Sequence, residues 1–165
     1  MYIVNFIVNV ILDLLKNPVL VSGFFAVIIA QFIKLLIDKK KHLDTNAKHF
    51  FHTGGMPSSH MCGTSAVFVS IGLINGFDSP LFAICFMICA VVMTDAKGVR
   101  YQAGKHAEYL NSFKEKENDD DLFYTSLGHT KKQVLVGMGV GALVGLIITF
   151  IYHFAEFSSY RIKYF

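Results

Sequence analysis

Small, hydrogen-bonding and titratable residues come together in the segment Gly54-Gly55-Met56-Pro57-Ser58-Ser59-His60, directly before a strongly hydrophobic stretch. A glycine pair lets the backbone turn tightly, and proline suits the first position of a helix. The hydroxyls of Ser58 and Ser59 and the free N–H groups of the new helix could bind an anion, with His60 beside it to move a proton. An ordinary capped helix start would use the same residue types, so the rest of the chain must decide.

Ionisable residues also occur within or at the ends of the apolar stretches, where charge is costly, and each is therefore a functional hypothesis. Lys34 lies about a turn before the end of one stretch, with Gln31 on the same helical face. The alternative is a lysine that extends to the membrane interface. Asp95 closes another stretch and is followed by Lys97, so its carboxylate would either serve catalysis or only pair with a nearby cation.

Arg100 and His106 follow with the spacing R-x-x-x-x-x-H. A guanidinium presents a fork of donors to phosphate oxygens, and an imidazole can act as a nucleophile or proton carrier. On its own this spacing is weak evidence. Combined with the lysine inside a membrane segment and the Pro-Ser-Ser-His turn, it indicates phosphoryl chemistry.

Hydrophobic helices must position these residues. The chain has 165 residues, of which 53% are hydrophobic, with 16 Phe and no Trp, and this is too apolar for a soluble domain of its size. A membrane span needs about 20 mostly apolar residues. The expected spans, in chain order, are residues 18–37, 61–77, 80–95 and 133–154.

The second expected span is short and rich in Ser, Gly, Cys and Ala, which indicates close packing against other helices. Residues 1–15 are apolar but interrupted by polar side chains, and we expect an interfacial or re-entrant helix there rather than a fifth span. The sequence thus predicts an all-α, multi-pass transmembrane helical bundle with about four spans. We expect it to form a single integral-membrane domain over residues 1–165.

Basic residues gather in two loops. Four lysines follow the first span, and seven cations lie between the third and fourth spans, whereas the turn at residues 75–80 has none. By the positive-inside tendency, both loops face the cytoplasm and the protein lies in the cell membrane. The net charge of +3, without basic runs interleaved with aromatic residues, gives no indication of nucleic acid. Cys62, Cys85 and Cys89 fall within spans, where packing is the expected role.

The motifs resemble those of a known family. They are Ala30-Gln31 with Lys34, the Gly-Gly-Met-Pro-Ser-Ser-His turn, Asp95-Ala96-Lys97-Gly98-Val99-Arg100 with Ala103-Gly104 and Leu110-Asn111, and Leu127-Gly128-His129-Thr130. The set is similar to the divergent branch of the type 2 phosphatidic acid phosphatase superfamily, also labelled acid phosphatase/vanadium-dependent haloperoxidase-related. It covers most of the chain, from about residue 18 to residue 150.

This resemblance implies a role for each matched residue. Pro57-Ser58-Ser59-His60 is similar to the superfamily's Pro-Ser-Gly-His element, whose histidine protonates the leaving oxygen. Arg100 and His106 match its arginine and its nucleophilic histidine, and Lys34 is the best match for its phosphate-binding lysine. From this resemblance taken together with the residues themselves, we expect His60, His106 and Asp95 to be catalytic, and we expect the substrate to be bound by Lys34, Gln31, Ser58, Ser59, Arg100 and Lys97. The implied mechanism uses a phosphohistidine and no metal or other cofactor.

The chain departs from the superfamily pattern at the residue that orients the nucleophile. The expected Asp, four residues after the nucleophile, is replaced by Leu110. Glu108, Asn111 or Asp95 would then have to orient the imidazole. No Lys-x6-Arg-Pro element precedes the turn. His129 in the Leu-Gly-His-Thr segment is an alternative nucleophile, although it would also suit a polar cap before the last span.

The favoured function is a membrane phosphatase that removes phosphate from a lipid phosphate or diphosphate, with phosphatidylglycerophosphate as one substrate that fits and phosphatidic acid left open. A non-enzymatic protein that binds or translocates anionic lipids is an alternative, because the orienting Asp is missing. A metal-dependent membrane phosphatase is another, with Asp95, Glu108 and the acidic run at residues 117–121 as ligands. The expected partners are the lipid substrate and membrane lipids, with a homodimer left open as a way to enclose the site.

Overall fold

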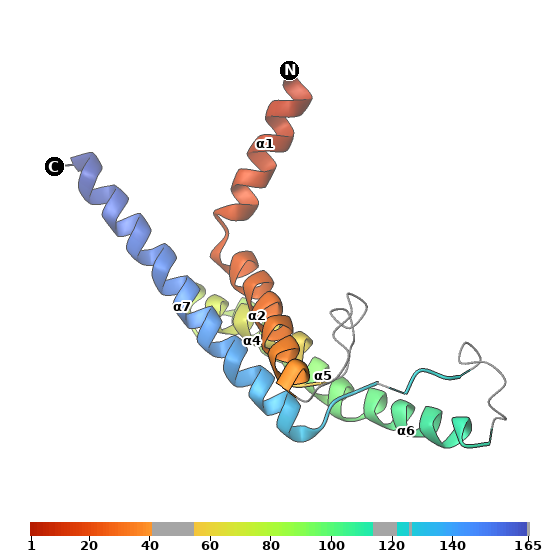
Figure 1. The fold of residues 1–165 in the computed structure, drawn as a ribbon. Helices are drawn as coiled ribbons and strands as arrows, with labels where there is room; N and C mark the ends of the chain where they lie inside the picture. Colours follow the sequence, from red (N-terminus) through yellow and green to blue (C-terminus); the bar gives the residue numbers. More distant parts are fainter. Residues whose placement is uncertain (41–54, 114–121, 126, 165) are drawn as a thin grey trace.

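The computed structural model describes residues 1–40, 55–113, 122–125 and 127–164, with side chains up to residue 155. Within these ranges the secondary structure is helical and contains no strand, so the all-α prediction is confirmed. Figure 1 shows a central bundle, with the N-terminal helix and the end of the C-terminal helix projecting from one end and a shorter green helix projecting from the other. The helices are α1 (Tyr2–Leu15), α2 (Pro18–Lys40), α4 (Ser59–Asn75), α5 (Pro80–Lys97), α6 (Val99–Asn111) and α7 (Lys131–Tyr164).

Three helical segments of the described chain are long and apolar enough to cross a membrane: Pro18–Lys40, Pro80–Asn111 and Lys131–Ala155. Helix α4 has 17 residues, which is about 26 Å of helix against a hydrocarbon core of about 30 Å. It packs against α2, α5 and α7 and is therefore the short central member of the bundle. The prediction of a multi-pass helical bundle is confirmed. The expected short apolar helix at the N-terminus is also found as α1. It has 14 residues, and none of them is buried.

Glycines bring α4 and α7 close together. A Cβ atom at Gly137 would lie 2.7 Å from the Ser58 carbonyl oxygen, and one at Gly145 would lie 2.5 Å from that of Ala66. Between them, a Cβ atom at Gly141 would collide with the backbone of Cys62. Residues four apart share one helical face, so these glycines form a continuous strip of the kind that lets membrane helices approach closely.

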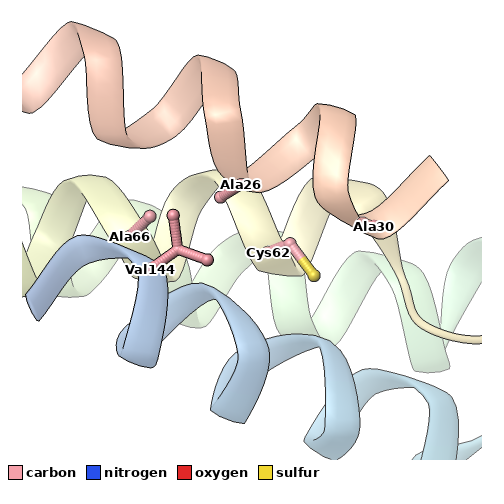
Figure 2. Close-up of a cluster of buried hydrophobic side chains, with 5 residues drawn as sticks. All are labelled: Ala26, Ala30, Cys62, Ala66 and Val144. Atoms are coloured by element: carbon pink, nitrogen blue, oxygen red, sulfur yellow. The ribbon is translucent and has the colours of Figure 1, made fainter. Parts of the chain in front are cut away.

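The core between α2, α4 and α7 is made of small side chains. Figure 2 shows five fully or almost fully buried residues from these helices, namely Ala26, Ala30, Cys62, Ala66 and Val144. Cys62 and Cys89 both lie in buried apolar clusters, as their expected packing role requires. Small side chains allow a short interaxial distance, and dispersion contacts then stabilise the bundle within lipid.

Buried hydroxyl groups cross-link the same three helices. The Ser70 hydroxyl donates to Ser22 Oγ at 2.8 Å, and the Thr149 hydroxyl donates to Ser70 Oγ at 3.0 Å. The Ser22 hydroxyl in turn donates to the Val19 carbonyl oxygen at 2.9 Å. Each of these three hydroxyl groups donates a hydrogen bond. The bonds therefore join α2, α4 and α7 and leave none of the three buried donors unpaired.

We expect Gly141→Ala to destabilise the bundle, because the added methyl group meets Cys62 backbone that cannot yield. Overpacking of this kind costs about 1–3 kcal/mol. Gly139 is the matched control, since it lies on the same helix and an added methyl group there would have no atom within 4 Å. Gly139→Ala should leave stability unchanged or raise it by up to about 1 kcal/mol through helix propensity. Reversible unfolding in mixed detergent micelles measures both, and equal stabilities of the two variants would contradict the close approach of α4 and α7.

Candidate active site where four helix ends meet

The first half of the site is the start of α4. Ser58 occupies the N-cap with extended backbone angles (φ −71°, ψ 114°), and α4 begins at Ser59. Pro57 therefore precedes the helix and does not occupy its first position, which corrects the expectation from the sequence. The Ser58 N–H donates to the Gln133 carbonyl oxygen at 3.2 Å. Gly54 lies outside the described residues.

The second half of the site is the start of α7, which carries a capping box. The Gln133 N–H donates to Thr130 Oγ1 at 3.4 Å, and the Thr130 N–H donates to Gln133 Oε1 at 2.8 Å. This reciprocal pair satisfies N–H groups that a helix start leaves free. Since the Gln133 carbonyl oxygen also accepts from Ser58, the capping box ties the two helix starts together. His60 follows one start and His129 precedes the other.

Residues 127–129 attach His129 to the junction of α5 and α6. The His129 N–H donates to the Ala96 carbonyl oxygen at 2.9 Å, which satisfies a carbonyl at the end of α5. Gly128 has φ +79°, and any side chain there would collide with the backbone of Tyr101. Glycine is required at this position for both reasons. The close approach places His129 against the helix end that carries Asp95.

Residues 122–125 and 127 run along α6. The Asn111 side chain donates to the Phe123 carbonyl oxygen and accepts from the Phe123 N–H, both at 2.8 Å. A Cβ atom at Gly104 would lie 2.7 Å from the Leu127 carbonyl oxygen and 2.8 Å from that of Thr125. Gly104 and Asn111 thus hold the segment that carries His129. Both polar groups of the Asn111 side chain, which was one of the expected partners of His106, take part in this contact.

A cavity of about 80 Å³ lies where these elements meet. Inside it, the Arg100 Nε–H donates to Asp95 Oδ2 at 2.5 Å. This ion pair fixes the guanidinium at the cavity wall and leaves its other N–H donors available for an anion. The cavity is lined by His60, Val92, Asp95, Ala96, Arg100, Leu127, Gly128 and His129.

His129 is a buried, neutral imidazole. Its side chain is 5% exposed. Burial is the largest cause that lowers the pKa of His129 to about 4, and the charges of Lys34, His60 and Arg100 act in the same direction. With a pKa far below 7, the ring carries an unprotonated nitrogen at neutral pH, which is the form required of a nucleophile.

Lys34 lies deep beside the cavity. It is 3% exposed, and its aliphatic chain packs on Gly55, where a Cβ atom would lie 3.2 Å from Lys34 Cδ. Gly55 has φ +92°, so glycine suits the turn and leaves room for the lysine. Lys34 is close enough to influence the ionisation of both His60 and His129. Asp38, a turn further along α2, is also buried.

Four buried polar atoms have no hydrogen-bond partner among the described residues: Gln31 Oε1, Ser58 Oγ and both ring nitrogens of His129. Each unpaired buried group costs about 1–3 kcal/mol, so such groups concentrate where a ligand supplies the missing bonds. Ser58 Oγ and the protonated ring nitrogen of His129 can donate to a phosphate oxygen, and Lys34 and Arg100 supply positive charge. Gln31 Oε1 is an acceptor, so it suits a donor such as a hydroxyl group or a water molecule.

The structure brings together most of the expected site residues. His60, Asp95 and Arg100 line the cavity. Lys34 and Gln31 lie towards the C-terminal end of α2, and Ser58 caps the N-terminal end of α4. Ser59 is buried in the first turn of α4.

His106 and Lys97 are both exposed, and neither lines the cavity. His106 lies six residues after Arg100 on α6, and six residues of α-helix turn the side chain to a different face. Of its expected orienting residues, Asp95 is paired with Arg100, Asn111 is bonded to Phe123, and Glu108 is exposed. The second histidine of the cavity is His129.

Sequence reasoning gave His129 too little weight. The signal was the pattern His-Thr-x-x-Gln before an apolar stretch, which forms a capping box at the start of α7. The Ser-Ser-His segment likewise opens α4, although Ser58 makes no side-chain cap bond there. Two histidines at two helix starts on one side of a bundle were therefore predictable.

These features define a class: a multi-pass helical membrane protein with a small site at one end of its bundle that contains two histidines and an arginine–aspartate ion pair. The chain belongs to the family described as the divergent PAP2 family, which matches residues 15–144. It is 32% identical over 158 residues to the uncharacterized membrane protein YuiD of Bacillus subtilis (strain 168), with 86% of this chain and 99% of that protein covered. No solved structure matches it.

Proposed function

We propose that this protein is a membrane-embedded lipid phosphate phosphatase that works through a histidine nucleophile. The observation that carries the proposal is the joint lining of one small cavity by His60, His129, Arg100 and Asp95, with Lys34 buried beside it. These are the groups that phosphoryl transfer without a metal requires: a nucleophile, a proton donor and fixed cations. Family membership supports the same reading.

In the proposed mechanism, a ring nitrogen of neutral His129 attacks phosphorus. The bond from phosphorus to the lipid oxygen breaks, and His60 protonates that oxygen as the lipid alcohol departs. Water then attacks the phosphohistidine, His60 accepts a proton from it, and inorganic phosphate leaves. Lys34 and Arg100 stabilise the charge on the equatorial oxygens. This proposal transfers the nucleophilic role from His106 to His129.

The N-termini of α4 and α7 support phosphate binding further. Both helices begin at the cavity, so both direct the positive ends of their dipoles and their first N–H groups towards it. The unpaired Ser58 hydroxyl lies at the first of these starts. An incoming phosphate would therefore meet hydrogen-bond donors and positive potential together.

We propose the cell membrane as the location, with the cavity on the cytoplasmic face. Described lysines at the ends of the bundle helices gather on the cavity side: Lys39, Lys40, Lys97, Lys131 and Lys132. This asymmetry supports a cytoplasmic orientation. A site on this face favours a lipid phosphate that is made inside the cell, and phosphatidylglycerophosphate and phosphatidic acid both fit.

A non-enzymatic role in binding or moving anionic lipids is the second candidate. It is favoured by one observation: neither ring nitrogen of His129 has a hydrogen-bond partner among the described residues, so no carboxylate there orients the imidazole. A binding protein needs no oriented nucleophile. Turnover by purified protein separates the two functions.

We expect purified protein in detergent micelles to release inorganic phosphate from phosphatidic acid or phosphatidylglycerophosphate. His60→Ala, Arg100→Ala and Lys34→Ala should each lower turnover by about 100-fold or more, the usual scale for loss of a general acid or charge-stabilising group. Lys39→Ala is the matched control for Lys34→Ala, because Lys39 is exposed on the same helix.

Turnover should persist in EDTA, and loss of activity on chelation would favour the metal-dependent alternative. Among the described residues, no three His, Cys, Asp or Glu side chains are grouped to hold a metal ion. The acidic run at residues 117–121 lies outside the described residues. Full phosphatase activity in His60→Ala, Arg100→Ala and Lys34→Ala would place the site elsewhere.

Comparison of two histidine variants identifies the nucleophile. Brief incubation with 32P-labelled substrate, followed by alkaline denaturation, should trap an acid-labile phosphoenzyme in the wild type. His129→Gln should abolish it, whereas His106→Gln should retain it, because only His129 lines the cavity. Phosphoenzyme that survives in His129→Gln and disappears in His106→Gln would return the role to His106.

A further inference from the structure

An apolar groove of about 500 Å³ runs along α4, with α2 on one side and α5 on the other. Helices α2 and α5 both pack on α4. Within the bundle, Gly23 and Gly63 let α2 cross close to α4, since a Cβ atom at either position would approach a valine of the other helix within 3 Å. The groove is lined by Leu20, Gly23, Phe24, Val27, His60, Gly63, Thr64, Val67, Cys85 and Ile88.

The chemistry of the groove is almost purely hydrocarbon. Its polar members are His60 at one end and Thr64, whose hydroxyl donates to the His60 carbonyl oxygen at 2.8 Å. With its hydroxyl used on its own helix, Thr64 can present its methyl group to the groove. The volume lies within the range of about 300–1,000 Å³ that is typical of small-molecule sites.

His60 lines both this groove and the small cavity that contains Arg100 and His129. The two spaces therefore meet at the side chain that would protonate the leaving oxygen. One is small and carries Arg100 and His129, and the other is larger and apolar. An amphiphile with a phosphate head and a hydrocarbon chain matches this pair of environments in charge and in polarity.

We propose that the groove between α2 and α5 binds a hydrocarbon chain of the substrate lipid while its phosphate occupies the cavity. This inference rests on the proposed function and adds how the substrate is held. On α4 the groove extends from His60 to Val67, about 10 Å along the helix. That is within one leaflet of a hydrocarbon core about 30 Å thick, so a lipid enters sideways from the bilayer without leaving its leaflet.

The groove provides alignment more than affinity. A chain that moves from lipid into an apolar groove gains little hydrophobic free energy, because the lipid tails it leaves are equally apolar. Binding is then driven by the phosphate, and the groove fixes the direction in which the scissile oxygen points towards His60. Misplacement of a reacting atom by about 1 Å can cost 100-fold in rate.

Ile88→Trp tests the groove, because Ile88 on α5 lines the groove and not the cavity, so a larger side chain there fills the groove from the side. For a long-chain phosphatidic acid we expect kcat/KM to fall by about 10-fold or more. For dihexanoyl phosphatidic acid, whose short chains do not reach along the groove, we expect a change of no more than about twofold, as for a surface substitution. Ile147→Trp is the matched control, an exposed isoleucine on α7 outside the groove, and should leave both rates unchanged.

A binding readout separates failure of the groove from failure of the proposed function. In nanodiscs, phosphatidic acid with a photoactivatable diazirine on its acyl chain should label α2, α4 and α5 at groove residues, and Ile88→Trp should remove this labelling. Labelling of the groove without phosphate release would support the groove and refute the phosphatase. An equal fall in kcat/KM for the long-chain and the dihexanoyl substrate in Ile88→Trp would overturn the groove proposal. Labelling confined to α1 or α7 would also overturn it.

Discussion

The close parallel packing of α4 and α7 is the constraint on which the site depends. Gly137, Gly141 and Gly145 allow it, because any side chain on that strip would meet the backbone of α4. Both helices begin at the same end of the bundle, so the contact brings two helix starts together and the bond from Ser58 to Gln133 joins them. The charge-binding properties of the site follow, since two dipole ends and their free N–H groups converge there.

Beside this contact, the backbone fixes the position of the buried histidine of the site. His129 is held by a backbone bond to Ala96 and by the glycine at 128, while its imidazole has no partner in the described structure. The chain thus fixes the ring in place by main-chain contacts and leaves both nitrogens for a ligand. Burial keeps the pKa of His129 near 4, so the same geometry that hides the ring also keeps it neutral.

Much of the fold was predictable from hydropathy alone, because spans within a membrane are set by length and apolar composition. The roles of Gly104, Asn111 and Gly128 were not, since nothing in their local pattern shows that residues 122–125 and 127–129 run along α6. Lys34 was predictable because charge within apolar sequence is costly. His60 was predictable from the turn that precedes an apolar stretch, and Arg100 from its position after another stretch and its phosphate-binding chemistry. His106 was expected in the site because of its spacing from Arg100. Spacing along the sequence does not show which segments touch each other. The contacts between segments place His129, and not His106, in the cavity.

A structure of the protein with orthovanadate in nanodiscs tests the central claim most directly, because vanadate adopts the trigonal bipyramidal geometry of in-line phosphoryl transfer. The account predicts vanadium bonded to a ring nitrogen of His129, with its oxygens bound by Arg100, Lys34 and Ser58 and an apical oxygen facing His60. Vanadate bonded to His106, or a cavity that excludes vanadate at saturating concentration, would contradict it.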